Sequence, residues 1–84
     1  MSTLAPVQPD LRHLRRRLRE QRSLPAPAER LALRQAAGLS RADIAVAVGV
    51  TPNSIRFWET GRSEPRGENL ARYVDVLRQL RAAS

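Results

Sequence analysis

Cysteine and lysine are both absent from this 84-residue chain, and aromatic residues make up only 4% of it. Without cysteine, the chain can form no disulfide and no cysteine-based metal or redox site. Because aromatic residues are so few, the core must come from Leu, Ile, Val and Ala, which favours packed helices over a β-sandwich or barrel. The sequence therefore predicts an all-α fold.

Long apolar runs are missing as well, and their absence bears on location. No stretch approaches the roughly 18 consecutive apolar residues that a membrane-spanning helix needs. The first residues also lack the charged start and apolar run of a secretory signal. We therefore expect a soluble, single-domain protein without a membrane partner, in the cytoplasm of a bacterium or of a phage-infected host cell.

Residue groups that would catalyse a reaction are not found in the sequence. Carboxylates are not paired on one helical face with a basic or nucleophilic partner, and no glycine-rich phosphate loop occurs. The single histidine, His13, cannot form a metal site alone and is expected to be exposed. The sequence predicts no enzyme activity, no cofactor, no metal and no small-molecule ligand.

All fifteen basic residues are arginine, and the net charge is +7. Arginine hydrogen-bonds to phosphates and guanine edges in pairs, whereas lysine offers a point charge, so this composition favours nucleic acid as a partner. A GC-rich genome would also supply arginine codons whatever the function, although it would not explain the net charge. Residues 1–24 hold six arginines against two acidic residues, so over half of the excess lies there.

The N-terminal third divides into two segments. Residues 1–9 are small, contain prolines and lack periodicity, and we expect a disordered lead-in there. Asp10 is a suitable N-cap for a basic amphipathic helix over residues 11–22, and a proline-containing interruption follows. Residues 10–24 are therefore expected to form a helix and linker in front of a domain over residues 25–84. The helix carries a narrow apolar stripe of Leu11, Leu14 and Leu18.

The basic helix has two interpretations, which can hold for different faces. In one, its arginines contact DNA phosphates outside the main site and strengthen binding in a salt-dependent way. In the other, the helix is solvated and docks on the domain through its leucine stripe. The arginines assigned to the auxiliary DNA contact are Arg12, Arg15, Arg16 and Arg19.

Start and stop signals divide residues 25–84 into four helices. Pro27 suits a first helical turn, Ser40 with Asp43 forms a capping box, and Thr51 is a good N-cap in front of Pro52. Glycines that favour a left-handed stop follow the first three helices, at residues 38, 49 and 61. The expected helices cover residues 27–37, 41–48, 52–60 and about 68–82.

The second and third of these helices meet across a short turn at Gly49, which is the helix-turn-helix arrangement. In that arrangement the second helix enters the major groove of DNA, and the first lies across the backbone. A helical wheel of residues 52–60 turns Ile55 and Trp58 inward. The opposite face consists of Asn53, Arg56, Phe57 and Thr60.

That outward face carries side chains suited to base edges. Asn pairs with adenine through two hydrogen bonds, Arg pairs likewise with guanine, and an exposed Phe contacts a thymine methyl. We expect Asn53 to be the main polar reader, Phe57 an apolar reader and Arg56 a reader at the edge. Phe57 could instead tuck against a neighbouring element such as the N-terminal helix.

Four motifs occur in order: AGLS at residues 37–40, DIA at 43–45, GVTPNSI at 49–55 and WETGRSEP at 58–65. With them, the chain resembles the lambda-repressor-like, or xenobiotic-response-element, helix-turn-helix family of phage repressors, Cro proteins and many antitoxins. The resemblance implies a compact four-helix domain, here preceded by an extra arginine-rich helix. It also implies a homodimeric, sequence-specific transcription regulator, of the Cro or repressor kind, on double-stranded DNA with an inverted-repeat operator. An antitoxin or protein-interaction module with autoregulatory DNA binding stays open as the alternative.

Roles for individual residues follow from the resemblance together with the wheel. The base-reading residues are expected to be Pro52, Asn53, Ser54, Arg56 and Phe57. The phosphate contacts are expected from Ser40, Arg41, Thr51, Thr60, Arg62 and Arg66. A half-buried structural ion pair is implied between Arg34 and Glu59.

Two departures from the family pattern bear on function. Pro52 and Phe57 stand where many relatives have polar side chains, so direct readout rests on fewer polar contacts. The chain also ends soon after the fourth helix of the domain, without the further helix that often forms the family's dimer interface. One edge of the last helix, formed by Tyr73, Val76 and Leu80, is therefore a candidate dimer interface. Alternatively, the wide apolar arc of that helix is a core face covered by the N-terminal leucine stripe.

Overall fold

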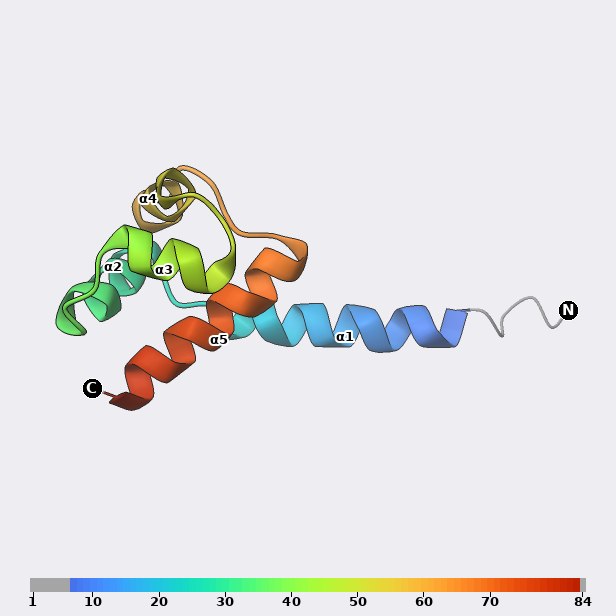
Figure 1. Ribbon diagram of the computed structural model, residues 1–84. Helices are drawn as coiled ribbons and strands as arrows, with labels where there is room; N and C mark the ends of the chain where they lie inside the picture. Colours follow the sequence, from blue (N-terminus) through green and yellow to red (C-terminus); the bar gives the residue numbers. More distant parts are fainter. Residues whose placement is uncertain (1–6, 84) are drawn as a thin grey trace, which may run out of the picture.

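The structure is a computed structural model that describes residues 7–83, with side chains described from residue 11. Within that range it contains no strand and five helices, so the predicted all-α fold is confirmed (Figure 1). None of the described helices is long and apolar enough to cross a membrane. The helices are α1 (Val7–Ser23), α2 (Pro27–Ala36), α3 (Arg41–Val48), α4 (Pro52–Thr60) and α5 (Gly67–Ala83).

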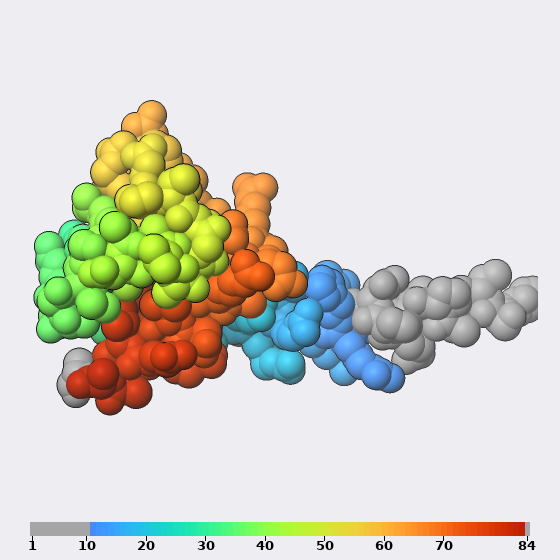
Figure 2. Space-filling view, viewed as in Figure 1, coloured from blue at the N-terminus to red at the C-terminus, as the bar shows by residue number. Residues whose placement is uncertain are grey.

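The helices α2 to α5 pack into one bundle, and α1 extends away from it (Figure 1). α4 packs on α2 and α3, and α5 packs on the same two helices. α1 contacts α5, and in the space-filling view it leaves the body of the protein beside that helix (Figure 2). α3 and α4 are therefore held by the bundle, whereas most of α1 is not.

The ends of α3 and α4 form as their sequences predict. Ser40 Oγ accepts a hydrogen bond from the backbone N–H of Asp43 at 3.0 Å, and the Asp43 carboxylate accepts one from the N–H of Ser40 at 2.9 Å. These bonds from Ser40 lower the pKa of Asp43. Gly49 ends α3 at φ 89° and Gly61 ends α4 at φ 77°, in the left-handed region that glycine enters without steric cost.

The core lies where α3, α4 and α5 meet. The rings of Trp58 and Tyr73 pack there with their centroids 4.8 Å apart and an interplanar angle of 45°. Partly buried leucines pack against the edge of this core, namely Leu24, Leu33 and Leu39. The buried apolar residues are Ile44, Ala45, Val48, Ile55, Trp58, Leu70, Tyr73, Val74 and Leu77.

The start of α1 differs from the prediction. Residues 7–9 belong to the helix, so Asp10 lies inside α1 and is not its N-cap. The rest of the predicted disordered lead-in, residues 1–6, lies outside the described residues. Pro9 does not prevent this earlier start, because the first turn of a helix needs no N–H donor and proline has none.

The leucine stripe of α1 does not dock on the bundle, so the interpretation in which it docks there is wrong. Leu11 is 42% exposed, Leu14 55% and Leu18 49%. The apolar arc of α5 is a core face, as one of the two interpretations held, but helices α2 and α3 cover it in place of the stripe. Because α1 meets the bundle only near α5 and then runs outward, its leucines remain in solvent (Figure 1).

Candidate nucleic-acid interface

α4 is fixed to the bundle by one face and leaves the other face open. Ile55 is fully buried and Trp58 is 5% exposed, so both anchor the helix in the core as the wheel predicts. Asn53, Arg56 and Thr60 are exposed on the opposite side. The outward face thus has the composition that the sequence predicts, on a helix whose position is set by packing.

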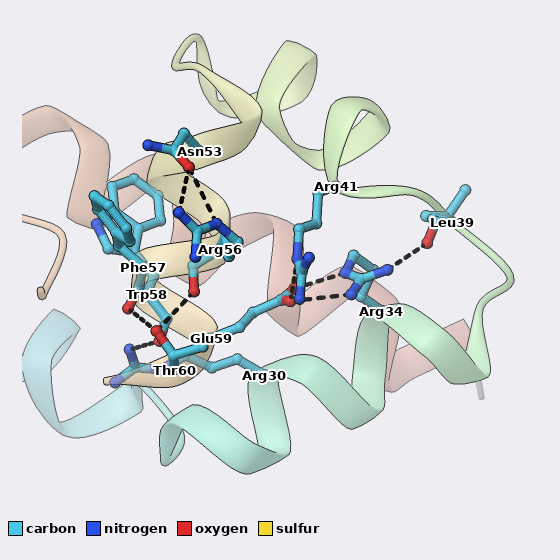
Figure 3. Close-up of polar contacts among 10 residues, drawn as sticks. All are labelled: Arg30, Arg34, Leu39, Arg41, Asn53, Arg56, Phe57, Trp58, Glu59 and Thr60. Atoms are coloured by element: carbon cyan, nitrogen blue, oxygen red, sulfur yellow. Dashed lines mark hydrogen bonds and ion pairs between the residues drawn. The ribbon is translucent and has the colours of Figure 1, made fainter. Parts of the chain in front are cut away.

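Two of the predicted base readers bind each other. Arg56 Nε and Nη2 donate to Asn53 Oδ1 at 3.1 and 2.9 Å (Figure 3). The half-buried ring of Phe57 has two guanidinium groups over it, from Arg56 at 4.8 Å and from Arg62 at 5.0 Å. The prediction treated these side chains as independent readers, but the structure joins them into one polar and aromatic cluster.

The N-cap hydroxyls of α3 and α4 lie at the exposed starts of the two helices. Ser40 Oγ and Thr51 Oγ1 each accept a backbone N–H, from Asp43 at 3.0 Å and from Ser54 at 3.3 Å. The Ser40 hydroxyl still has its own proton to donate, and a phosphate oxygen can accept it. Thr51 Oγ1 also bonds to Ser54 Oγ at 3.2 Å, and either of these two hydroxyls can be the donor. Each hydroxyl lies at the positive end of its own helix dipole, which favours an anion at these positions.

Thr60 is less suited to the phosphate contact that we expected of it. Its hydroxyl donates to the backbone carbonyls of Arg56 and Phe57, at 3.0 and 3.2 Å. Since a hydroxyl has one proton, Thr60 must break its bond within α4 before it can donate to a phosphate.

Glu59 is the centre of a buried ionic network under α4 (Figure 3). Its carboxylate, 1% exposed, accepts bonds from Arg34 Nε at 2.6 Å and from Arg34 Nη2 at 3.0 Å. Arg41 Nε also donates to it, at 3.0 Å. Burial raises the pKa of Glu59, but the bonds and charges of the two arginines outweigh this effect and lower its pKa. The bond to Glu59 in turn raises the pKa of Arg34.

The network contains the implied pair of Arg34 and Glu59 and adds Arg41 to it. Arg41 was expected to contact phosphate, and its side chain is 37% exposed although one nitrogen is bound to Glu59. The start of α3 is therefore tied to α4 through a carboxylate shared with α2. Sequence spacing did not indicate this third partner, because Arg41 and Glu59 lie on different helices.

Arg30 is a structural residue that sequence reasoning missed. It is 4% exposed and donates to the carbonyls of Pro25 at 2.7 Å and Trp58 at 2.9 Å, and to the Glu64 carboxylate at 2.9 Å. The Trp58 carbonyl lies in the last turn of α4, where helix carbonyls lack partners within the helix. Arg30 thus fixes the end of α4 from α2. The sequence did contain a sign of this role, because Arg30 lies one helical turn before Arg34 and therefore on the same face of α2.

The arginines of α1 do not join this interface. The four assigned to an auxiliary contact are exposed, and α1 meets the bundle beside α5 and then extends away from it (Figure 1). Arg17 of α1 donates to the Gly67 carbonyl of α5 at 2.6 Å, which ties α1 to the bundle, and it pairs with Glu20 within α1. His13 is exposed, as expected.

The dimer candidates on α5 divide into two kinds. Tyr73 is 1% exposed and belongs to the core, so it offers no surface to a partner and the prediction is corrected for this residue. Burial raises its pKa to about 12. Val76 and Leu80 are half-buried and pack against the edge of the core.

Comparison with protein families gives one match, to the lambda-repressor-like helix-turn-helix family, over residues 31–81. The matched segment covers more than half of the chain, from the middle of α2 to near the end of α5. The chain therefore belongs to this family of DNA-binding regulators, and the predicted resemblance is confirmed. None of the curated proteins and none of the solved structures compared with it matches the chain.

Proposed function

We propose that this protein is a sequence-specific transcription regulator that reads the major groove of double-stranded DNA with α4. The observation behind this proposal is the outward face of α4, where Asn53, Arg56 and Phe57 lie together above the buried anchors Ile55 and Trp58. A helix fixed in this way can present side chains to base edges at a constant depth. Pro52 and Ser54, at the start of α4, would lie closest to the groove floor.

Phosphates on either side of the groove would be held by the groups around α4. Ser40 and Thr51 supply hydroxyls at helix N-termini, and Arg41, Arg62 and Arg66 supply positive charge. Such contacts carry little sequence information, but they fix the position of the reading helix. Arg41→Ala and Arg62→Ala should therefore weaken binding to all sequences alike and flatten the salt dependence by about one unit of slope each.

Two copies of the chain are proposed to bind an inverted-repeat operator, as Cro proteins and repressors do. A nine-residue reading helix spans few base pairs, and a two-fold symmetric dimer doubles its contacts. The half-buried Val76 and Leu80 are the remaining candidates for the dimer contact. Leu80 also lines a small apolar cavity of about 60 Å³, together with Ala36, Ala37 and Ala83.

Selection from random double-stranded DNA, followed by footprinting and sizing of the complex, tests this proposal. We expect one selected motif with two-fold symmetry, protection of about two major-groove turns on one face, and two chains per site. A chain that binds all DNA equally would contradict sequence-specific regulation. A selected motif without symmetry, bound by one chain, would contradict the dimer alone.

The second candidate function, protein interaction as in an antitoxin, is favoured by the exposed leucine stripe of α1. Three leucines at 42% to 55% exposure form an apolar strip that DNA phosphates would not cover. Leu14→Glu should then abolish binding of a protein partner and leave DNA binding unchanged. If Leu14→Glu alters DNA binding and the chain stays monodisperse without a partner, this candidate fails.

A further inference from the structure

Asn53 and Arg56 lie one turn apart on α4 and are joined in the unbound chain by the two hydrogen bonds to Asn53 Oδ1 (Figure 3). The Asn53 amide has only one orientation that fits. If it were turned over, its NH₂ group would face the N–H groups of the guanidinium, donor against donor. Asn53 therefore gives its acceptor to Arg56 and leaves its Nδ2 donor free.

This pairing removes the acceptor that adenine recognition requires. Adenine presents the acceptor N7 and the donor N6 in the major groove, and Asn binds both through its own donor and acceptor. Asn53 Oδ1 already accepts two N–H groups, which occupy both of its lone pairs. Towards a base edge, Asn53 then offers a donor only.

Arg56, by contrast, still has the donors that guanine recognition requires. A guanidinium has five N–H groups, and the bonds to Asn53 use the one on Nε and one on Nη2. The remaining three lie on Nη1 and Nη2, at the end of the side chain. Guanine presents two acceptors, N7 and O6, in the major groove, and Arg binds them together.

Phe57 restricts Arg56 from a second direction. The Arg56 guanidinium lies 4.8 Å from the centre of the Phe57 ring, within the range of about 6 Å in which cation–π attraction acts. The Arg62 guanidinium lies over the same ring. An exposed arginine held by an amide and by a ring loses less conformational freedom when it binds than a free one does.

We propose that Arg56 reads one guanine in each half of the binding site, and that Asn53 is a positioning residue for Arg56 and not an adenine reader. This inference rests on the proposed function, since it needs α4 in the major groove. It reverses the order expected from the sequence, in which Asn53 was the main polar reader and Arg56 lay at the edge.

Binding-site selection from random double-stranded DNA, with sequencing, tests the inference on four full-length chains. These are the unmodified chain, Arg56→Ala, Asn53→Ala and Asn53→Asp. Arg56→Ala should lose discrimination for one guanine by about 5- to 150-fold. Asn53→Ala should lose part of the discrimination at that same base pair. Asn53→Asp should retain it, because a carboxylate accepts the same two bonds, although its charge weakens binding to all sequences.

A double variant and a folding control complete the design. Asn53→Ala combined with Arg56→Ala should discriminate no worse than Arg56→Ala alone, because a positioning residue has no effect without the residue it positions. Both side chains are exposed, so circular dichroism should show unchanged melting of every variant. Loss of an adenine preference in both Asn53 variants would overturn the inference while the proposed function stands. If the unmodified chain selects no sequence, both fail.

Discussion

Leucine and arginine occupy opposite environments in α1 and in the bundle of α2 to α5. Leu14 in α1 is 55% exposed, whereas Leu77 in α5 is 3% exposed. Arg30 and Arg34 in α2 are bound by carbonyl and carboxylate oxygens inside the bundle, whereas the outward arginines of α1 are in solvent. Both α1 and α5 have leucines at helical spacing. An amphipathic pattern therefore identifies an apolar side without showing whether the same chain covers it.

The largest expected effect tests the buried charges of the bundle. Glu59→Gln should lower the free energy of unfolding by about 3 to 5 kcal/mol, because it leaves Arg34 buried without a counter-charge. Urea denaturation measures this loss. Asp75→Asn is the matched control, since the Asp75 side chain is 61% exposed, and it should change stability by less than about 0.5 kcal/mol. Equal losses of stability from the two substitutions would contradict a special contribution of the buried Glu59 network to stability.

A pair of leucine truncations compares the two regions directly. Leu77→Ala should cost about 2 to 5 kcal/mol, because it opens a cavity in the core. Leu14→Ala should change stability by less than about 0.5 kcal/mol, since its side chain is already in water. Thermal melts of both variants in the same buffer measure the difference. A large cost for Leu14→Ala would mean that α1 is covered in solution.

The same comparison applies to arginine, with a smaller expected effect. Arg30→Ala should cost about 1.5 to 3 kcal/mol, because the carbonyls of Pro25 and Trp58 lose a charged donor. Arg19→Ala in α1 removes the same side chain from an exposed position and should cost almost nothing. Denaturant midpoints of the two variants test this. Similar midpoints would contradict a structural role for Arg30.

The smallest effect is the response to acid. The folded chain holds the pKa of Glu59 below its ordinary value of 4.5, so the stabilisation is complete above that pH and is lost as the pH falls through the lower folded value. One proton gives a slope of at most about 1.4 kcal/mol per pH unit. Unfolding measured in this range should show a shallower slope in Glu59→Gln than in the unmodified chain. If stability falls with pH at the same slope in both chains, carboxylates other than Glu59 are responsible for the acid response.

Helix boundaries within the bundle could be predicted because their signals are local. Ser40 with Asp43 and Thr51 with Ser54 form caps between residues three apart, and Gly49 and Gly61 provide the left-handed stops. Such contacts depend on neighbours in the sequence and little on the rest of the fold. The inward anchors Ile55 and Trp58 followed from helical periodicity for the same reason.

Contacts between helices could not be predicted in the same way. Arg30 of α2 binds the Trp58 carbonyl of α4, and Arg41 shares the Glu59 carboxylate with Arg34, so each contact depends on how helices cross. The pairing of Asn53 with Arg56 lies within one helix, but both side chains also suited direct base contacts. Whether the leucines of α1 reach the bundle depends on the direction of the linker after Ser23, which local sequence signals do not determine.

The contact between Trp58 and Tyr73 gives the chain an intrinsic fluorescence probe of its own packing. Trp58 is the single tryptophan of the sequence, and it lies 5% exposed on α4 against the single tyrosine, which belongs to α5. Emission from its indole therefore comes from the contact between α4 and α5, without any added dye. A red shift on heating would report departure of α4 from the bundle, and an unshifted spectrum on titration with DNA would show that the helix docks as a rigid body.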